Sequence, residues 1–197
     1  MTLPTDPAER HRAVADGFTA RVRGASTWDA PAPVAGWRAR DVVGHLVGWF
    51  PGFMEGGTGL VLERGPSAEE DPVAAWQVHA DAVQRLLDGP GAATPFRHPM
   101  VGAMPLPDAV DRFYTTDVFL HTWDLARATG QDERLDPETC ADLLAAMVPI
   151  EALLRSSGQY GPAVPVPEGA DAQTRLLGFI GRDVSQGRNR PAPRPVS

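Results

Sequence analysis

Residues 107–130 read PDAVDRFYTTDVFLHTWDLARATG, and this stretch predicts one long helix. Glycine is the residue that most often ends a helix, so Gly130 sets the predicted end at Thr129. Apolar side chains recur along the stretch with the 3.6-residue period of a buried helix face: Val110, Phe113, Tyr114, Leu120 and Leu125. We therefore expect this helix to lie in the core of an all-α fold.

Two ionisable side chains interrupt the apolar face of that helix. Asp117 and His121 are four residues apart, so both lie on the side that carries the apolar residues. A second predicted helix, residues 37–50, carries His45 on its own apolar face, with Trp49 one turn further on. All three ionisable groups are therefore expected to point into the core.

A bound metal ion would explain why these groups are buried. Burying a carboxylate and two imidazoles costs several kcal/mol unless they are paired or coordinated. Two imidazole nitrogens and one carboxylate are typical of catalytic zinc sites, which keep a position open for water or substrate. We predict that His45, Asp117 and His121 bind a divalent metal, zinc first and nickel or iron(II) as alternatives. Asp124 is predicted to fix one of the imidazoles through a hydrogen bond.

The spacing alone leaves simpler interpretations open. A lone histidine on a helix face, such as His45, is more often a core or surface residue than a ligand. A carboxylate and an imidazole four residues apart, such as Asp117 and His121, often form a plain ion pair. Nothing in the spacing shows that the two helices are neighbours.

Other chemistry-bearing residues are weaker candidates. His98 is kept in reserve as a ligand, whereas His11 and His79 are expected to be solvated or bonded locally. Cys140 and the five tryptophans are expected to pack in the core or at its edge. The segment 56–59 lacks the lysine and the strand of a phosphate-binding loop.

The rest of the chain reads as further helices joined by loops. The first helix is predicted over residues 8–23, and a long crossover over residues 51–71. The remaining predictions are a helix from 71 to 88, an irregular span or hairpin around 96–100, a helix over 136–154 kinked at Pro149, and a short helix over 171–184. We expect one domain over residues 1–187 and a disordered proline-rich tail over 188–197.

Composition excludes several classes of function. The 197 residues carry a formal net charge of −7, which disfavours nucleic acid as a partner. No apolar run is long enough to cross a membrane and no signal peptide is visible, so we expect a cytoplasmic protein. All 18 basic residues are arginine, which excludes Schiff-base chemistry on lysine. A single cysteine, Cys140, excludes an internal disulfide and fits a reducing compartment.

Three motifs together resemble a known family. They are WRARDVVGHL (residues 37–46), DVFLHTWDLARATG (117–130) and LLGFIGRD (176–183). The chain is similar to the DinB-like superfamily, and within it to actinobacterial metal-binding proteins related to the N-terminal domain of mycothiol-dependent maleylpyruvate isomerase. The resemblance implies a four-helix bundle of up-down-down-up type with extra short helices, with ligands matching His45, Asp117 and His121. The isomerase has glutamate where this chain has Asp117, and we expect this chain to have no counterpart of the isomerase's C-terminal domain.

The resemblance and the predicted site together favour one function. We expect a metal-dependent enzyme that uses a thiol, mycothiol, for transfer to or isomerisation of a small electrophile. Isomerisation of maleylpyruvate itself is not the first choice, because we expect no counterpart of the isomerase's C-terminal domain. The alternatives are a metal-dependent hydrolase and a non-enzymatic bundle that binds a metal or small ligand. Members of the superfamily are often dimeric, so a homodimer is the assembly that the resemblance suggests.

Overall fold

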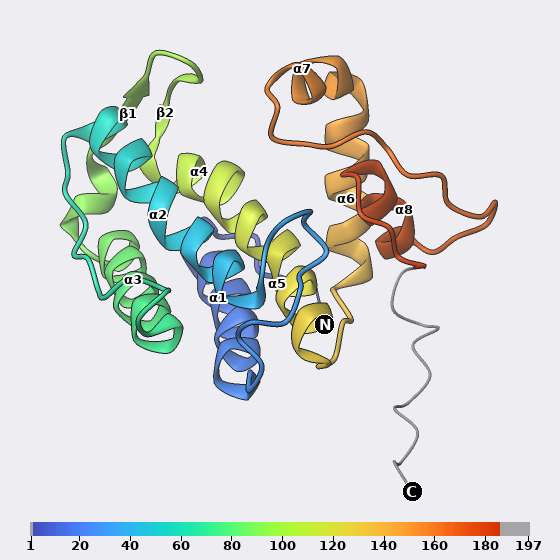
Figure 1. Cartoon of the computed structure of the whole chain (residues 1–197). Helices are drawn as coiled ribbons and strands as arrows, with labels where there is room; N and C mark the ends of the chain where they lie inside the picture. Colours follow the sequence, from blue (N-terminus) through green and yellow to red (C-terminus); the bar gives the residue numbers. More distant parts are fainter. Residues whose placement is uncertain (1, 186–197) are drawn as a thin grey trace, which may run out of the picture. The chain divides into compact units, whose positions relative to one another are not determined.

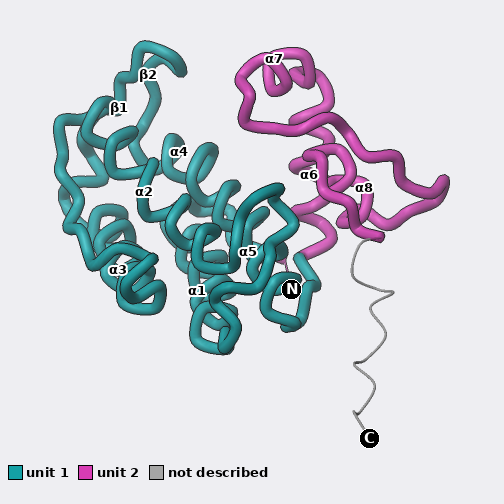
Figure 2. Tube along the Cα trace, viewed as in Figure 1, with its two compact units in different colours: residues 1, 3–135 teal, residues 2, 136–197 magenta. Residues whose placement is uncertain are grey.

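A computed structural model describes residues 2–185, which are mostly helical with one small β-hairpin (Figure 1). The described residues form two compact units, residues 3–135 and residues 136–185 (Figure 2). The all-α prediction is confirmed at the level of helical content. No described helix has the length and apolar character needed to cross a membrane.

Four long helices make up most of the first unit: α1 (Pro7–Gly24), α2 (Ala39–Thr58), α3 (Pro72–Asp88) and α5 (Thr116–Thr129). α1 packs against α3 and α5, and α2 packs against the same two helices. Large side chains with no exposed surface fill the space between them, including Phe18, Leu46, Phe50, Tyr114 and Leu125. The apolar faces predicted from the sequence are therefore the faces that form this core.

An Asp-Pro pair starts α1 and α3, and the start of α3 at Asp71 is the predicted one. Asp6 accepts hydrogen bonds from the backbone N–H groups of Ala8 and Glu9, and the proline that follows occupies the first turn of α1. Asp71 accepts two such hydrogen bonds at the start of α3. An N-cap of this kind contributes about 1 kcal/mol, and proline has no N–H to leave unpaired there.

The end of α2 differs from the prediction. We expected the helix to stop at Phe50, but it runs through Pro51 to Thr58 and ends where Gly59 adopts a left-handed φ of 75°. The proline costs one backbone hydrogen bond, yet the extra turns bury Met54 completely. Core packing thus outweighs the local preference, and the crossover is confined to residues 59–71.

The long predicted helix over 107–129 is continuous but not uniform. It begins as α4 (Leu106–Ala109), widens into a π-helical segment η2 (Val110–Thr115) and continues as α5. The N–H of Thr116 bonds to the carbonyl of Asp111, five residues earlier, which is the mark of the wider turn. The predicted end is confirmed, since Gly130 takes a left-handed φ of 70°.

A β-hairpin packs on the end of α2, which confirms the hairpin alternative around residues 96–100. Strand β1 (Pro95–His98) pairs antiparallel with β2 (Gly102–Pro105), and a short 3₁₀ turn, η1 (Pro90–Ala93), precedes them. Phe96 is fully buried and its ring lies where a side chain at Gly57 would stand. The close approach of the two segments requires glycine at that position.

The second unit contains α6 (Pro137–Met147), η3 (Val148–Ile150), α7 (Glu151–Ser156) and α8 (Ala172–Phe179). The interruption at η3 confirms the kink predicted at Pro149. α8 packs on α6 but ends at Phe179, before the predicted residue 184, because Gly181 turns the chain with a positive φ of 89°. The predicted tail, residues 188–197, lies outside the described residues.

Candidate metal centre

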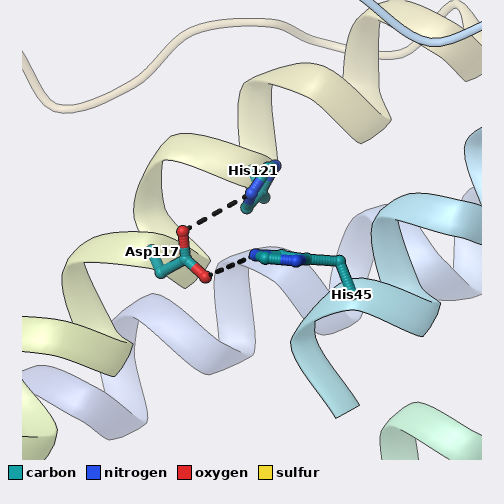
Figure 3. Close-up of side chains that lie close together, drawn as sticks. All are labelled: His45, Asp117 and His121. Atoms are coloured by element: carbon teal, nitrogen blue, oxygen red, sulfur yellow. Dashed lines mark hydrogen bonds and ion pairs between the residues drawn. The ribbon is translucent and has the colours of Figure 1, made fainter. Parts of the chain in front are cut away.

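Three predicted ligands converge between α2 and α5 (Figure 3). Nε2 of His45 lies 3.0 Å from Oδ2 of Asp117, and Nε2 of His121 lies 3.4 Å from Oδ1 of the same carboxylate. One ligand atom from each of the three residues lies within 4.8 Å of the other two. The carboxylate therefore sits between two imidazole nitrogens, which is a spacing that one cation can span. We call these residues the His-Asp-His cluster.

Exposure rises across the His-Asp-His cluster in one direction. The side chain of His121 is 7% exposed, that of Asp117 is 23% exposed and that of His45 is 31% exposed. His121 is thus fixed inside the protein, while the side nearest His45 faces solvent. A cation held here would have protein ligands on the inner side and room for water or another ligand on the outer side.

Asp124 lies behind His121, where the sequence placed it. Its carboxylate is completely buried, and Oδ2 lies 2.8 Å from Nδ1 of His121. A carboxylate accepts hydrogen bonds, so the proton of a neutral His121 resides on Nδ1. Nε2 then presents its lone pair to the cluster, which is the tautomer that a metal needs.

Two tryptophans, expected in the core or at its edge, are partly buried and lie against the cluster. Nε1 of Trp49 donates a 2.9 Å hydrogen bond to Oδ2 of Asp117. The ring of Trp37 stacks on His121 with centroids 5.7 Å apart and lies 5.1 Å from the ring of His45. Trp49 could have been found from sequence, because it shares a face with His45 and a partly buried indole N–H needs an acceptor. Trp37 gave no comparable signal.

The surroundings favour the charged form of Asp117. In the metal-free protein burial opposes ionisation, but the attraction of the imidazolium form of His121 and the hydrogen bonds from His45 and Trp49 outweigh it. The pKa of the Asp117 carboxyl therefore lies below its ordinary value of 3.8. The carboxylate is ionised at neutral pH and contributes the negative charge that a divalent cation requires.

The other histidines lie elsewhere in the first unit. His98 is on β1, where its ring packs 5.0 Å from that of Phe53, so it does not join the cluster. The expectation that His11 and His79 are solvated or locally bonded is wrong, since they are 0% and 3% exposed. Nδ1 of His11 lies 2.9 Å from Oγ1 of Thr115, 104 residues away, and this long-range contact is invisible to local patterns.

Comparison with known proteins identifies the family. Residues 9–126 match the family described as the mycothiol maleylpyruvate isomerase N-terminal domain. The chain is 32% identical over 185 residues to uncharacterized proteins of two Mycobacterium tuberculosis strains, CDC 1551 and H37Rv, covering 91% of this chain and 99% of each relative. No solved structure gives a significant match. The family match spans α1 through most of α5, including all three residues of the His-Asp-His cluster, and the chain belongs to the mycothiol maleylpyruvate isomerase N-terminal domain family.

Proposed function

We propose that the protein is a metal-dependent enzyme that activates a thiol, mycothiol, for transfer to or isomerisation of a small electrophile. The observation that carries this proposal is the His-Asp-His cluster, whose three ligand atoms lie within 4.8 Å of one another. The family match supports mycothiol as the thiol. The two imidazoles and the carboxylate of the cluster are suitable ligands for a divalent ion, with zinc as the first choice and nickel or iron(II) as alternatives.

The residues fit such an ion in charge, protonation and number. Asp117 supplies one negative charge, and the hydrogen bond with Asp124 favours the tautomer of His121 that directs the Nε2 lone pair toward the cluster. Three protein ligands leave further coordination positions, and the 31% exposure of His45 gives access to them. When bound, the ion would stabilise a thiolate over the thiol and so supply a nucleophile at neutral pH.

The residues around that thiolate would have different roles in the reaction. His45, Asp117 and His121 hold the ion, and Trp49 and Asp124 hold two of those ligands in place. The ring of Trp37 covers the two imidazoles and limits the access of water from that side. In the reaction the thiol proton passes to solvent and the sulfur forms a bond to the electrophilic carbon. Transfer then expels a leaving group, whereas isomerisation reverses the addition after rotation about the former double bond.

Further expectations belong to the same proposal. We propose that α1, α2, α3 and α5 form the up-down-down-up bundle of the DinB-like superfamily, a proposal supported by the contacts of α1 and α2 with α3 and α5. We also propose a cytoplasmic location and a homodimer, neither of which changes the composition of the cluster. Asp117 is shorter by one methylene than the glutamate of the isomerase, so we expect a different preference among metals.

Consumption of mycothiol tests the proposed function. Zinc-loaded protein is incubated with mycothiol and a panel of small electrophiles, and loss of free thiol is followed against the same protein after chelation. We expect metal-dependent loss of thiol that disappears in Asp117→Asn. Absence of turnover across the panel, with the metal still bound, would overturn the enzymatic proposal and leave a metal-binding protein.

A further inference from the structure

A row of partly exposed aromatic side chains starts at the His-Asp-His cluster and runs away from it. It consists of Trp49, Phe53 and Phe113, which we call the aromatic strip. The rings of Trp49 and Phe53 have centroids 5.5 Å apart, and those of Phe53 and Phe113 are 5.4 Å apart. Trp49 also bonds to Asp117, so the strip and the cluster are in direct contact.

The residues of the strip and the cluster recur at four-residue intervals on two segments that face each other. On α2 the residues at four-residue intervals are His45, Trp49 and Phe53. On η2 and α5 they are Phe113, Asp117 and His121. His45 contacts Asp117 at one end and Phe53 contacts Phe113 at the other, which shows that the two rows face each other. The strip itself covers one four-residue interval of α2, Trp49 to Phe53, which spans about 6 Å, enough for one or two fused rings beside the cluster.

The strip is not simply part of the core. Phe50 and Tyr114, the neighbours of its members in sequence, are 0% exposed and stack with centroids 3.9 Å apart. Burying a phenylalanine side chain fully contributes about 1.5 to 3 kcal/mol, yet the rings of the strip retain exposed surface. Partly exposed aromatic side chains beside a candidate site are typical of residues that bind a ligand.

The hairpin side chains of Phe96 and His98 lie 5.0 Å from the ring of Phe53, but neighbouring positions on α2 add no further cover to the strip. Gly48 and Gly52 precede Trp49 and Phe53, and a Cβ atom added at either glycine would meet nothing within 4 Å. Each glycine in a helix interior costs about 1 kcal/mol relative to alanine. The glycines do not define a site by themselves, but they leave this side of α2 free of side chains that could cover the strip.

A positive charge lies at the far end of the strip. The guanidinium of Arg112 lies 5.5 Å from the ring centroid of Phe113, in a cation–π contact. Within residues 2–185 this exposed arginine makes no ion pair, whereas eight other arginines do. An anionic group on a ligand would find its partner there.

We propose that the aromatic strip and Arg112 bind the electrophile of the proposed reaction, and that this electrophile is a planar aromatic molecule with an anionic group. The rings of Trp49, Phe53 and Phe113 would stack on its flat part, and Arg112 would pair with the anion. The reactive carbon would then lie toward Asp117, beside the cluster. The statement that the bound molecule is the electrophile rests on the proposed function. Binding to the strip itself needs neither metal nor thiol.

Binding of naphthalenesulfonate to the metal-free protein tests the strip directly. A sulfonate is a poor metal ligand, and chelation removes any contribution from the cluster. Isothermal titration compares this probe with cyclohexanesulfonate, which carries the same charge without an aromatic ring. We expect naphthalenesulfonate to bind more tightly, and Phe53→Leu, Phe113→Leu and Arg112→Gln each to weaken it about threefold to tenfold.

The second unit provides a matched control. The guanidinium of Arg155 lies 4.9 Å from the ring of Phe179, which is also partly exposed, and we expect Phe179→Leu to leave the affinity unchanged. Arg112→Gln changes only an exposed side chain, so it stays informative if a phenylalanine variant fails to fold. Equal affinities for the two sulfonates, or equal losses in Phe179→Leu and Phe113→Leu, would overturn the proposal.

The outcome is separable from that of the thiol assay. Tight, strip-dependent binding without any turnover of mycothiol would support the binding site and refute the enzymatic proposal alone. Turnover without binding of the aromatic probe would support the enzyme and refute the strip as the electrophile site.

Discussion

The indole of Trp49 and the carboxylate of Asp117 are joined by a 2.9 Å hydrogen bond from Nε1 to Oδ2. Asp117 is also the residue that lies between the two imidazoles of the cluster. Trp49 thus restricts the carboxylate that contributes the only negative charge among the three proposed ligands. Groups that hold a metal ligand in this way typically change metal affinity tenfold to a hundredfold when they are removed.

Trp49→Phe is expected to weaken metal binding without removing a ligand. Loss of the indole N–H frees the Asp117 carboxylate to rotate, so we expect the dissociation constant for zinc to rise about tenfold. Competition with a chromophoric chelator measures it. Trp28→Phe, at a partly exposed tryptophan outside the cluster, serves as the control and should leave the constant unchanged. An unchanged constant in Trp49→Phe would remove Trp49 from the site.

Asp124→Asn tests the residue behind His121. The substitution keeps the shape but removes the charge that holds the proton on Nδ1, so we expect zinc affinity to fall tenfold to a hundredfold. The control is Asp111→Asn in η2, the segment before α5. It breaks an ion pair with Arg10 of α1 and should leave the zinc affinity unchanged. If both variants bind zinc as the wild type does, Asp124 has only a packing role.

Acid is expected to destabilise the metal-free protein between pH 6.5 and pH 4. Burial, with help from nearby positive groups, lowers the pKa of His11 and of His79 to about 4, from 6.5. The unfolded chain therefore binds more protons than the folded chain in this range, and stability falls as the pH is lowered through it. Either histidine alone would contribute up to about 3 kcal/mol of this loss.

Urea unfolding at several pH values measures this effect in the presence of a chelator. His79→Gln should flatten the dependence, whereas His98→Gln, at a partly exposed histidine, should leave it unchanged. Equal slopes in the wild type and in His79→Gln would show that the buried imidazole does not titrate as expected.

Two glycines of α2 are expected to respond to alanine in opposite directions. At Gly52 the added methyl group meets nothing within 4 Å, so Gly52→Ala should stabilise the fold by about 0.5 to 1 kcal/mol. At Gly57 the methyl group would collide with the ring of Phe96, so Gly57→Ala should destabilise it by about 1 to 3 kcal/mol. Thermal unfolding measures the change in melting temperature of each variant. Changes of the same sign in the two variants would contradict the packing of the hairpin on α2.

Features encoded within one helix could be predicted from the sequence. The start of α3 at Asp71 and the end of α5 at Gly130 are local, and their positions are confirmed. The faces of α2 and α5 that carry His45 and Asp117 are also local, because a four-residue spacing fixes them.

Features that depend on distant contacts could not be predicted. The passage of α2 through Pro51 depends on the burial of Met54, and the burial of His11 depends on Thr115. Convergence of His45 with Asp117 needs α2 and α5 to be neighbours, which spacing does not reveal. The resemblance to a family supplied that expectation, and the structure brings the side chains together.

Elemental analysis of the purified protein tests the central claim most directly. We expect one equivalent of a divalent transition metal per chain in the wild type and in His98→Ala, and loss of that metal in His45→Ala, Asp117→Ala and His121→Ala, each shown to be folded by circular dichroism. A full equivalent of metal retained in all three cluster variants, or no metal bound by the wild type even after incubation with zinc, would contradict it.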